Sequence, residues 1–102
     1  MGITVILGGG MRFKFDGRKS AQCRRNPRRG IGFEEAQKLW GQPYYLDQRS
    51  ENPEQWRAIG WVGNRLFSVI YEERADEFGE YLHLVTLWQS TQEEQRLYEE
   101  NS

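Results

Sequence analysis

The sequence predicts an α+β fold in which helices pack against an antiparallel sheet, with the element order β-α-α-β-β-β-α. Three observations support this fold class. Helical and extended patterns occur in separate runs instead of alternating one by one along the chain. Two β-rich segments flank the pair Gly63-Asn64, which is typical of a hairpin turn. The chain has 102 residues, of which 14% are aromatic, and this suffices for one hydrophobic core but not for two.

The N-terminal end of the chain carries a short apolar run, ITVIL, and three consecutive glycines before Met11. The run has no preceding basic residues and is far shorter than the roughly 20 residues that cross a bilayer, so we expect neither a signal peptide nor a membrane anchor. We expect residues 1–10 to be an extension, from an alternative translation start or an expression remnant, that is ordered only if ITVIL joins a sheet edge. Residues 11–102 then form the single domain.

Local signals predict a strand and two helices in the next part of the chain. Residues 12–15 alternate basic and aromatic side chains, which indicates a short strand. Asp16 can cap a strongly basic helix over residues 17–25, which ends before Pro27 because proline disfavours helical backbone at the preceding residue. After a glycine-containing turn, residues 33–41 place apolar side chains on one face of a second short helix.

The middle of the chain predicts a loop and then three strands. Residues 42–53 hold two prolines and several turn formers, so we expect mostly loop, with a brief strand at residues 44–46 as the alternative. Residues 56–62 and 65–71 form the hairpin. A third strand over residues 81–89 extends the sheet as an antiparallel meander.

The C-terminal part predicts an acidic turn and a final helix. The turn covers residues 72–80 and separates the second and third strands of the meander. A capping box can start the helix in either of two ways, through Ser90 with Glu93 or through Thr91 with Glu94. The glutamates of this helix most simply form a solvated face.

The net charge of −1 hides a strong segregation along the chain. Residues 12–29 contain eight basic side chains and one acidic side chain, a balance of +7, whereas residues 30–102 contain six basic and fourteen acidic, a balance of −8. A basic segment in an otherwise acidic domain can form a face that binds phosphate groups. Alternatively, these arginines pair with carboxylates of the same chain. Charge alone leaves both interpretations open.

The composition excludes several kinds of site. Cys23 is the only cysteine and His83 the only histidine, so one chain cannot form a disulfide framework or a Cys/His zinc site. We therefore expect no metal and no cofactor, and a reducing cytoplasm as the natural compartment.

The order and spacing of several short motifs resemble the BrnT family of small bacterial ribonuclease toxins, over roughly residues 13–100. The matching residues are Asp16 and Lys19 near the first helix, Gly30, Phe33 and Ala36 in the turn and second helix, Arg57 in Arg57-Ala58-Ile59-Gly60, and Thr91, Glu94 and Tyr98 at the C-terminal end. The chain also departs from the family pattern. Asn26 and Pro27 stand where the family has Lys-His, and His83 and Trp88 replace two arginines of its last strand.

The resemblance implies a RelE-like fold and a toxin role in a type II toxin-antitoxin system. It also implies metal-independent cleavage of RNA and a small antitoxin protein as partner. Such cleavage needs a base for the ribose 2′-hydroxyl and cations for the charge on the phosphorane. We take Arg57, Lys19 and His83 as candidate catalytic residues, and Arg24, Arg25, Arg28 and Arg29 as candidate RNA-binding residues.

Each candidate residue also has a plain structural interpretation. His83 can be a packed strand residue, Lys19 a solvated helix residue, and Arg57 a partner for a neighbouring aromatic ring. Two other functions therefore stay open. The chain can be a family member that has lost catalysis and binds nucleic acid or protein, with dimerisation through the aromatic hairpin. It can also be a small interaction domain whose basic helix docks an acidic protein.

Overall fold

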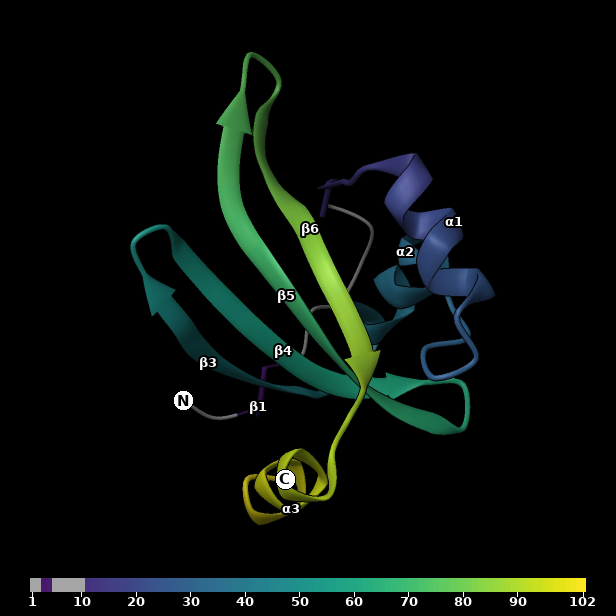
Figure 1. Cartoon of the computed structure of the whole chain (residues 1–102). Coiled ribbons are helices and arrows are strands. Elements are labelled where there is room, and N and C mark those ends of the chain that lie inside the picture. Colours follow the sequence, from purple (N-terminus) through teal and green to yellow (C-terminus); the bar gives the residue numbers. More distant parts are fainter. Residues whose placement is uncertain (1–2, 5–10) are drawn as a thin grey trace.

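The computed structural model describes residues 3–4 and 11–102, and within them it shows an α+β fold around a six-stranded sheet with the order β1-β3-β4-β5-β6-β2 (Figure 1). The elements in chain order are β1 (Ile3–Thr4), β2 (Phe13–Lys14), α1 (Gly17–Arg25), α2 (Phe33–Ala36), the 3₁₀ helix η1 (Gln37–Gly41), β3 (Tyr44–Glu51), β4 (Glu54–Val62), β5 (Arg65–Asp76), β6 (Gly79–Gln89) and α3 (Gln92–Glu100). The predicted α+β class is confirmed, but the predicted order β-α-α-β-β-β-α is not, because β1 and β3 are additional strands and η1 follows α2.

The sheet differs from the expected antiparallel sheet at one edge. Strand β2 pairs in parallel with β6, whereas the pairs β1–β3, β3–β4, β4–β5 and β5–β6 are antiparallel. The sheet is therefore mixed, because β2, which precedes α1 in the chain, lies at the edge of the sheet beside β6, the last strand of the meander. A strand of two residues carries no sequence signal for the direction of its partner.

The prediction that residues 42–53 are mostly loop is wrong, because most of this segment forms the strand β3. Tyr44 faces the larger core and Tyr45 the opposite side, as the alternation of a strand in the middle of a sheet requires. Pro43 and Pro53 lie just outside the two ends of the strand, where a missing backbone N–H costs no ladder hydrogen bond. The prolines therefore delimit a strand instead of excluding it.

The expected acidic turn at residues 72–80 is also much shorter than predicted. Strands β5 and β6 continue to Asp76 and from Gly79, which leaves only two residues at the tip. Asp76 accepts hydrogen bonds from Lys14 of β2, on the far side of β6, and from Arg12 just before β2, so its charge is compensated within the chain. The result is a long hairpin that extends beyond the other strands (Figure 1).

The predicted second helix over residues 33–41 is confirmed only in part, because it consists of the short α2 followed by the 3₁₀ helix η1. Three further local predictions are confirmed. Helix α1 has the predicted bounds, and the Asp16 side chain accepts from the first backbone N–H groups. Gly63 has a φ of 63°, whereas the φ of Asn64 is negative. This combination is typical of a type II′ turn between β4 and β5. Helix α3 begins with the capping box of Thr91 and Glu94, the second of the two predicted boxes.

The sheet has two differently covered faces. Helices α1 and α2 and η1 cover one face, where side chains such as Phe33, Leu39 and Val69 are fully buried. On the other face, which we call the α3 face, Ile59 lies in a small cluster against Leu97 of α3. Figure 1 shows α3 at one end of the sheet, away from α1 and α2. Much of the α3 face is therefore not covered by a helix.

The expectation for the N-terminal residues can be examined only in part. Ile3 and Thr4 pair with Tyr45 and Tyr44 at the edge of β3, so this part of ITVIL does join a sheet edge. The other residues of the range 1–10 lie outside the described residues. Within the described ranges, 3–4 and 11–102, we find no helix with the length and apolar character needed to cross a membrane.

Candidate nucleic-acid interface

The basic segment at residues 12–29 divides into paired and unpaired cations. Arg12 and Lys14 bind the carboxylate of Asp76 at 2.7 and 2.6 Å. The side chain of Arg24 binds Glu34 at 2.8 Å and Glu35 at 3.1 Å, across the turn that joins α1 to α2. These cations are matched by carboxylates of the chain. Arg24 therefore does not fit its predicted role as a free RNA ligand.

The remaining five cations of this segment make no ion pair with any carboxylate in the described part of the chain. We call them the α1 cations: Arg18, Lys19, Arg25, Arg28 and Arg29. Arg18, Arg25 and Arg28 are exposed, and Lys19 and Arg29 are half-buried. They all lie on α1 or on the turn that follows it. This arrangement concentrates uncompensated positive charge on one part of the surface.

The turn after α1 is held by its own hydrogen bonds. The Asn26 side chain accepts from the backbone N–H of Arg28 at 2.9 Å, and its carbonyl accepts from the backbone N–H of Gly30 at 2.7 Å. Gly30 has a φ of 77°, a conformation that favours glycine. Arg29 donates one hydrogen bond to the sulfur of Cys23 at 3.4 Å, which uses one of its five N–H donors. The turn thus presents its guanidinium groups from a defined backbone.

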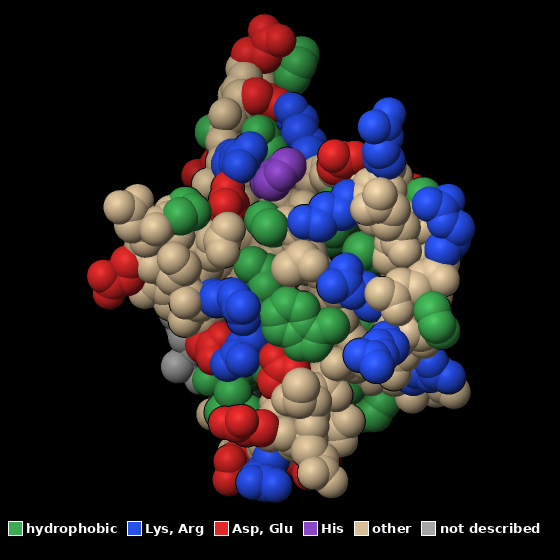
Figure 2. All heavy atoms as spheres, in the orientation of Figure 1, with side chains coloured by type: hydrophobic (Ala, Val, Ile, Leu, Met, Phe, Trp, Pro, Cys, Tyr) green, Lys and Arg blue, Asp and Glu red, His purple; other side chains and the backbone are tan. Residues whose placement is uncertain are grey.

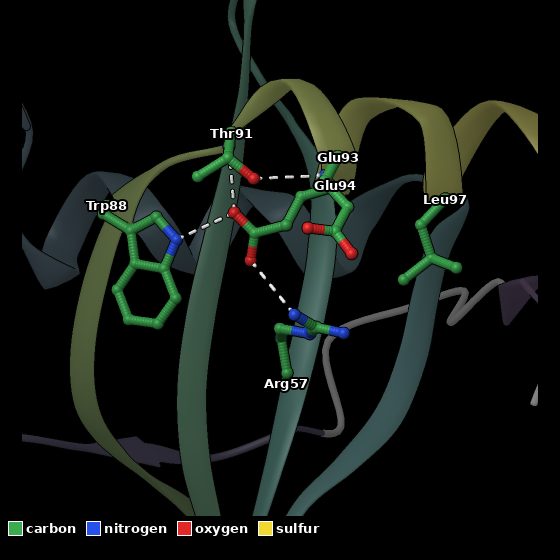
Figure 3. A pocket seen from close by; sticks show the side chains of 6 residues that line it. All are labelled: Arg57, Trp88, Thr91, Glu93, Glu94 and Leu97. Carbon is green, nitrogen blue, oxygen red and sulfur yellow. Dashed lines mark hydrogen bonds and ion pairs between the residues drawn. The ribbon is translucent and has the colours of Figure 1, made fainter.

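Arg57 lies elsewhere and is neutralised. It projects from β4 onto the α3 face, where its Nε donates to Asp47 at 2.9 Å. Its Nη1 lies 3.3 Å from Glu94 (Figure 3). The hydrogen bonds to Asp47, together with both negative charges, raise the pKa of Arg57 against the opposing effect of burial. The Arg57 side chain is only 23% exposed. A phosphate would have to displace two carboxylates, so the predicted role of Arg57 as a phosphate ligand does not fit this geometry.

Glu94 was expected on a solvated helix face, and this is wrong because it is only 5% exposed. Its carboxylate accepts from Trp88 Nε1 and from the backbone N–H of Thr91, each at 2.9 Å. Burial alone would raise the pKa of Glu94, but these hydrogen bonds and the charge of Arg57 lower it. Glu94 therefore links α3 to the sheet as a charged group.

His83 projects onto the α3 face from β6, in register with Glu72 of β5 and Lys14 of β2. Its pKa is lowered by burial and by the charges of Arg74 and Lys19, with Glu72 acting in the opposite direction. The imidazole is therefore neutral at neutral pH, the form that can accept a proton from a ribose hydroxyl. The structure brings Lys19 and His83 into one electrostatic environment.

The three candidate catalytic residues do not form one site. Arg57 and His83 share the α3 face, but they are two strands apart and two positions apart along the sheet. Strand geometry places their backbones about 12 Å from each other. The side chain of Arg57 also turns toward Asp47 and Glu94. Lys19 is related to His83 only through its charge, which contributes to the lowered pKa of the imidazole.

The exposed surface around His83 carries both basic and acidic side chains, and the α1 side carries further basic ones. Figure 2 shows Lys and Arg side chains around the single histidine, and further ones on the side of the molecule where Figure 1 draws α1. The α1 cations and His83 thus border the part of the sheet that α3 leaves uncovered. A polyanion that follows this edge would meet positive charge along its length.

The comparisons with known proteins add no family. No protein-family model matches this chain, and no curated protein matches it. Among the described residues there is also no group of three or more His, Cys, Asp or Glu side chains that could hold a metal ion.

The electrostatic effect on His83 gives a direct test of the site. Replacing Lys19 in the variant Lys19→Ala should raise the pKa of His83, because a nearby positive charge disfavours the imidazolium. The pKa of His83 is lower in the folded than in the unfolded protein. The free energy of unfolding of the wild type should therefore decrease as the pH falls from the unfolded toward the folded pKa of His83, and this decrease should be smaller in the variant. NMR titration of the single histidine measures the pKa. Lys38→Ala is the control, and an unchanged pKa in Lys19→Ala would show that the two groups are not neighbours.

Proposed function

We propose that this protein binds RNA through the α1 cations. The observation that carries the proposal is that five cations of one short segment stay unpaired in the described structure, although the whole chain has more acidic than basic residues. Unpaired arginines on a defined turn suit phosphate groups, because each guanidinium can donate two parallel hydrogen bonds. The pairing of Arg57 removes one predicted catalytic cation, and this favours a binding function over a fully equipped ribonuclease.

The resemblance to BrnT-type toxins supplies the rest of the proposal. In that interpretation the chain is a divergent member with a RelE-like fold, it acts in the cytoplasm, and a small antitoxin protein controls it. Homodimerisation through the aromatic hairpin belongs to the same set of proposals. None of these points depends on Arg57 as a catalytic residue.

A second candidate function is metal-independent cleavage of RNA, and the pair of Lys19 and His83 favours it. A neutral imidazole could take the proton of the 2′-hydroxyl, and Lys19 could stabilise charge that develops on the phosphate. Replacing two family arginines by His83 and Trp88 leaves fewer cations for that charge. We therefore place binding first and cleavage second.

Incubation of the purified protein with total RNA in the presence of EDTA tests both functions. We expect RNA to be bound, with an affinity that falls steeply as salt rises, because phosphate contacts release counterions. Cleavage that persists in Arg57→Ala and disappears in His83→Ala would add the second function. Absence of RNA binding at physiological salt would refute the proposal, and so would equally tight binding of polyglutamate, which would indicate an acidic protein partner.

A further inference from the structure

Trp88 is an aromatic side chain on the α3 face that the local sequence did not single out as functional. It projects from β6 opposite Ser68 of β5 and is half-buried. The guanidinium of Arg49, an exposed residue of β3, lies 5.2 Å from the centre of its ring. One side of the ring is therefore in a cation–π contact with an exposed side chain, which a stacking base would have to displace.

Hydrogen bonds hold the ring of Trp88 in place. Its Nε1 donates to Glu94 at 2.9 Å, and Glu94 is itself fixed by the backbone N–H of Thr91 and by Arg57 (Figure 3). The ring thus needs little ordering when a ligand arrives, and such preorganisation lowers the entropic cost of binding. The contact between Arg57 and Glu94 therefore helps to position the ring of Trp88, because Glu94 accepts hydrogen bonds from both side chains.

A cavity of about 320 Å³ lies beside the ring of Trp88. Its lining combines the aromatic ring with the charged groups of Arg57, Glu93 and Glu94, the Thr91 hydroxyl, and the apolar side chain of Leu97 (Figure 3). This volume is at the lower end of small-ligand sites, and a flat heterocycle would fit it better than a bulky group. The polar groups at the rim can donate or accept hydrogen bonds at the edge of such a ring.

The α3 face and the α1 side of the molecule are seen together in Figure 2, where Lys and Arg side chains lie along the sheet and where Figure 1 draws α1. Trp88 and His83 lie on the same face of β6. A polynucleotide whose phosphate groups contact the α1 cations can therefore place one of its bases on the ring of Trp88. Bases in a duplex are stacked and paired inside the helix, so only an unpaired base can stack on a protein ring.

We infer that the ligand is single-stranded RNA and that one unpaired base stacks on the ring of Trp88 while the backbone contacts the α1 cations. This inference rests on the proposed RNA binding and names the form of RNA that the site takes. Arg49 then contacts the outer face of the same base or a phosphate beside it.

The experiment compares two variants of one residue. Trp88→Phe and Trp88→Leu both lose the hydrogen bond to Glu94, but only Trp88→Phe keeps an aromatic ring. Fluorescence anisotropy measures the affinity of each for a labelled single-stranded RNA, for its duplex, and for an abasic ribose-phosphate chain of equal length. Circular dichroism checks that the variants fold. The control is Trp61→Leu, because Trp61 is 41% exposed and lines a different cavity.

The expected result is that the wild type prefers the single strand to both other probes. Trp88→Leu should lose about tenfold in affinity for the single strand and nothing for the abasic chain, since stacking contributes about that much per base. Trp88→Phe should keep most of the affinity. Equal losses in both Trp88 variants, or equal wild-type binding of all three probes, would overturn this inference alone. No RNA binding by the wild type would overturn the proposed function as well.

Discussion

The variant Glu94→Ala should lower the free energy of unfolding by about 3 kcal/mol, because the carboxylate closes the helix cap and accepts two further charge-assisted contacts. It accepts from the backbone N–H of Thr91, from Trp88 Nε1 and from Arg57. Of these donors, only Arg57 has a second acceptor in the described structure, the carboxylate of Asp47. For a chain of this size, the melting temperature should fall by more than about 10 °C. Urea and thermal unfolding followed by circular dichroism measure the change.

The neighbouring variant Glu93→Ala is the matched control, because Glu93 is exposed and lies in the same helical turn. It should change stability by less than about 0.5 kcal/mol. The folded-state pKa of Glu94 is lowered, so its contribution is present at neutral pH and is lost as pH falls through that pKa. The difference in the free energy of unfolding between the wild type and Glu94→Ala should therefore become smaller at acidic pH. Similar melting of the two variants would show that Glu94 does not anchor α3.

The triple variant Arg25→Gln, Arg28→Gln and Arg29→Gln should reduce the affinity for single-stranded RNA by about fiftyfold at 0.15 M salt. For single-stranded nucleic acid, each phosphate contact contributes about 0.7 to the slope of log affinity against log salt concentration. If the contacts contribute nothing at 1 M salt, the loss of three of them lowers the affinity by about fiftyfold at 0.15 M salt. None of the three side chains binds a carboxylate in the described structure, so the substitutions should leave folding intact. Anisotropy with labelled RNA measures the affinity.

A second triple variant separates a local effect from the change in net charge. Lys38, Arg65 and Arg96 are exposed, make no ion pair with the described carboxylates, and lie outside α1 and its turn. Their replacement by glutamine removes the same charge from other parts of the surface. This variant should lose only a few-fold in affinity. Equal losses in the two triple variants would mean that the RNA contact is not localised at the α1 cations.

The sequence predicted those features of the fold that depend on neighbouring residues, such as helix ends and tight turns. The cap at Asp16 and the proline at position 27 bound α1 on both sides, and Gly63 closes the β4–β5 turn by its positive φ. The strand β3 was missed because its evidence is long-range pairing with β4, whereas its prolines suggested a loop. The parallel pairing of β2 with β6 was missed for the same reason. Two residues cannot indicate a partner almost seventy positions away.

The candidate site was harder to predict, because ion pairing depends on side chains far apart in the chain. Arg57 meets Asp47 and Glu94, which are 10 and 37 residues away. The capping box at the start of α3 was visible in the sequence, but its Glu94 also reaches Arg57 and Trp88 only after α3 docks on the sheet. The charge segregation left a basic face and internal ion pairs as alternatives, and the structure contains both. Which cations stay unpaired is decided by the fold.

The most direct test of the central claim is the salt dependence of RNA binding in the wild type and in the variant of Arg25, Arg28 and Arg29. The claim is that these unpaired cations, together with Lys19 and Arg18, contact phosphate groups, and that the paired Arg57 does not. The account predicts that the slope of log affinity against log salt is shallower in the variant by about 2. A slope that is the same in both proteins would contradict the account.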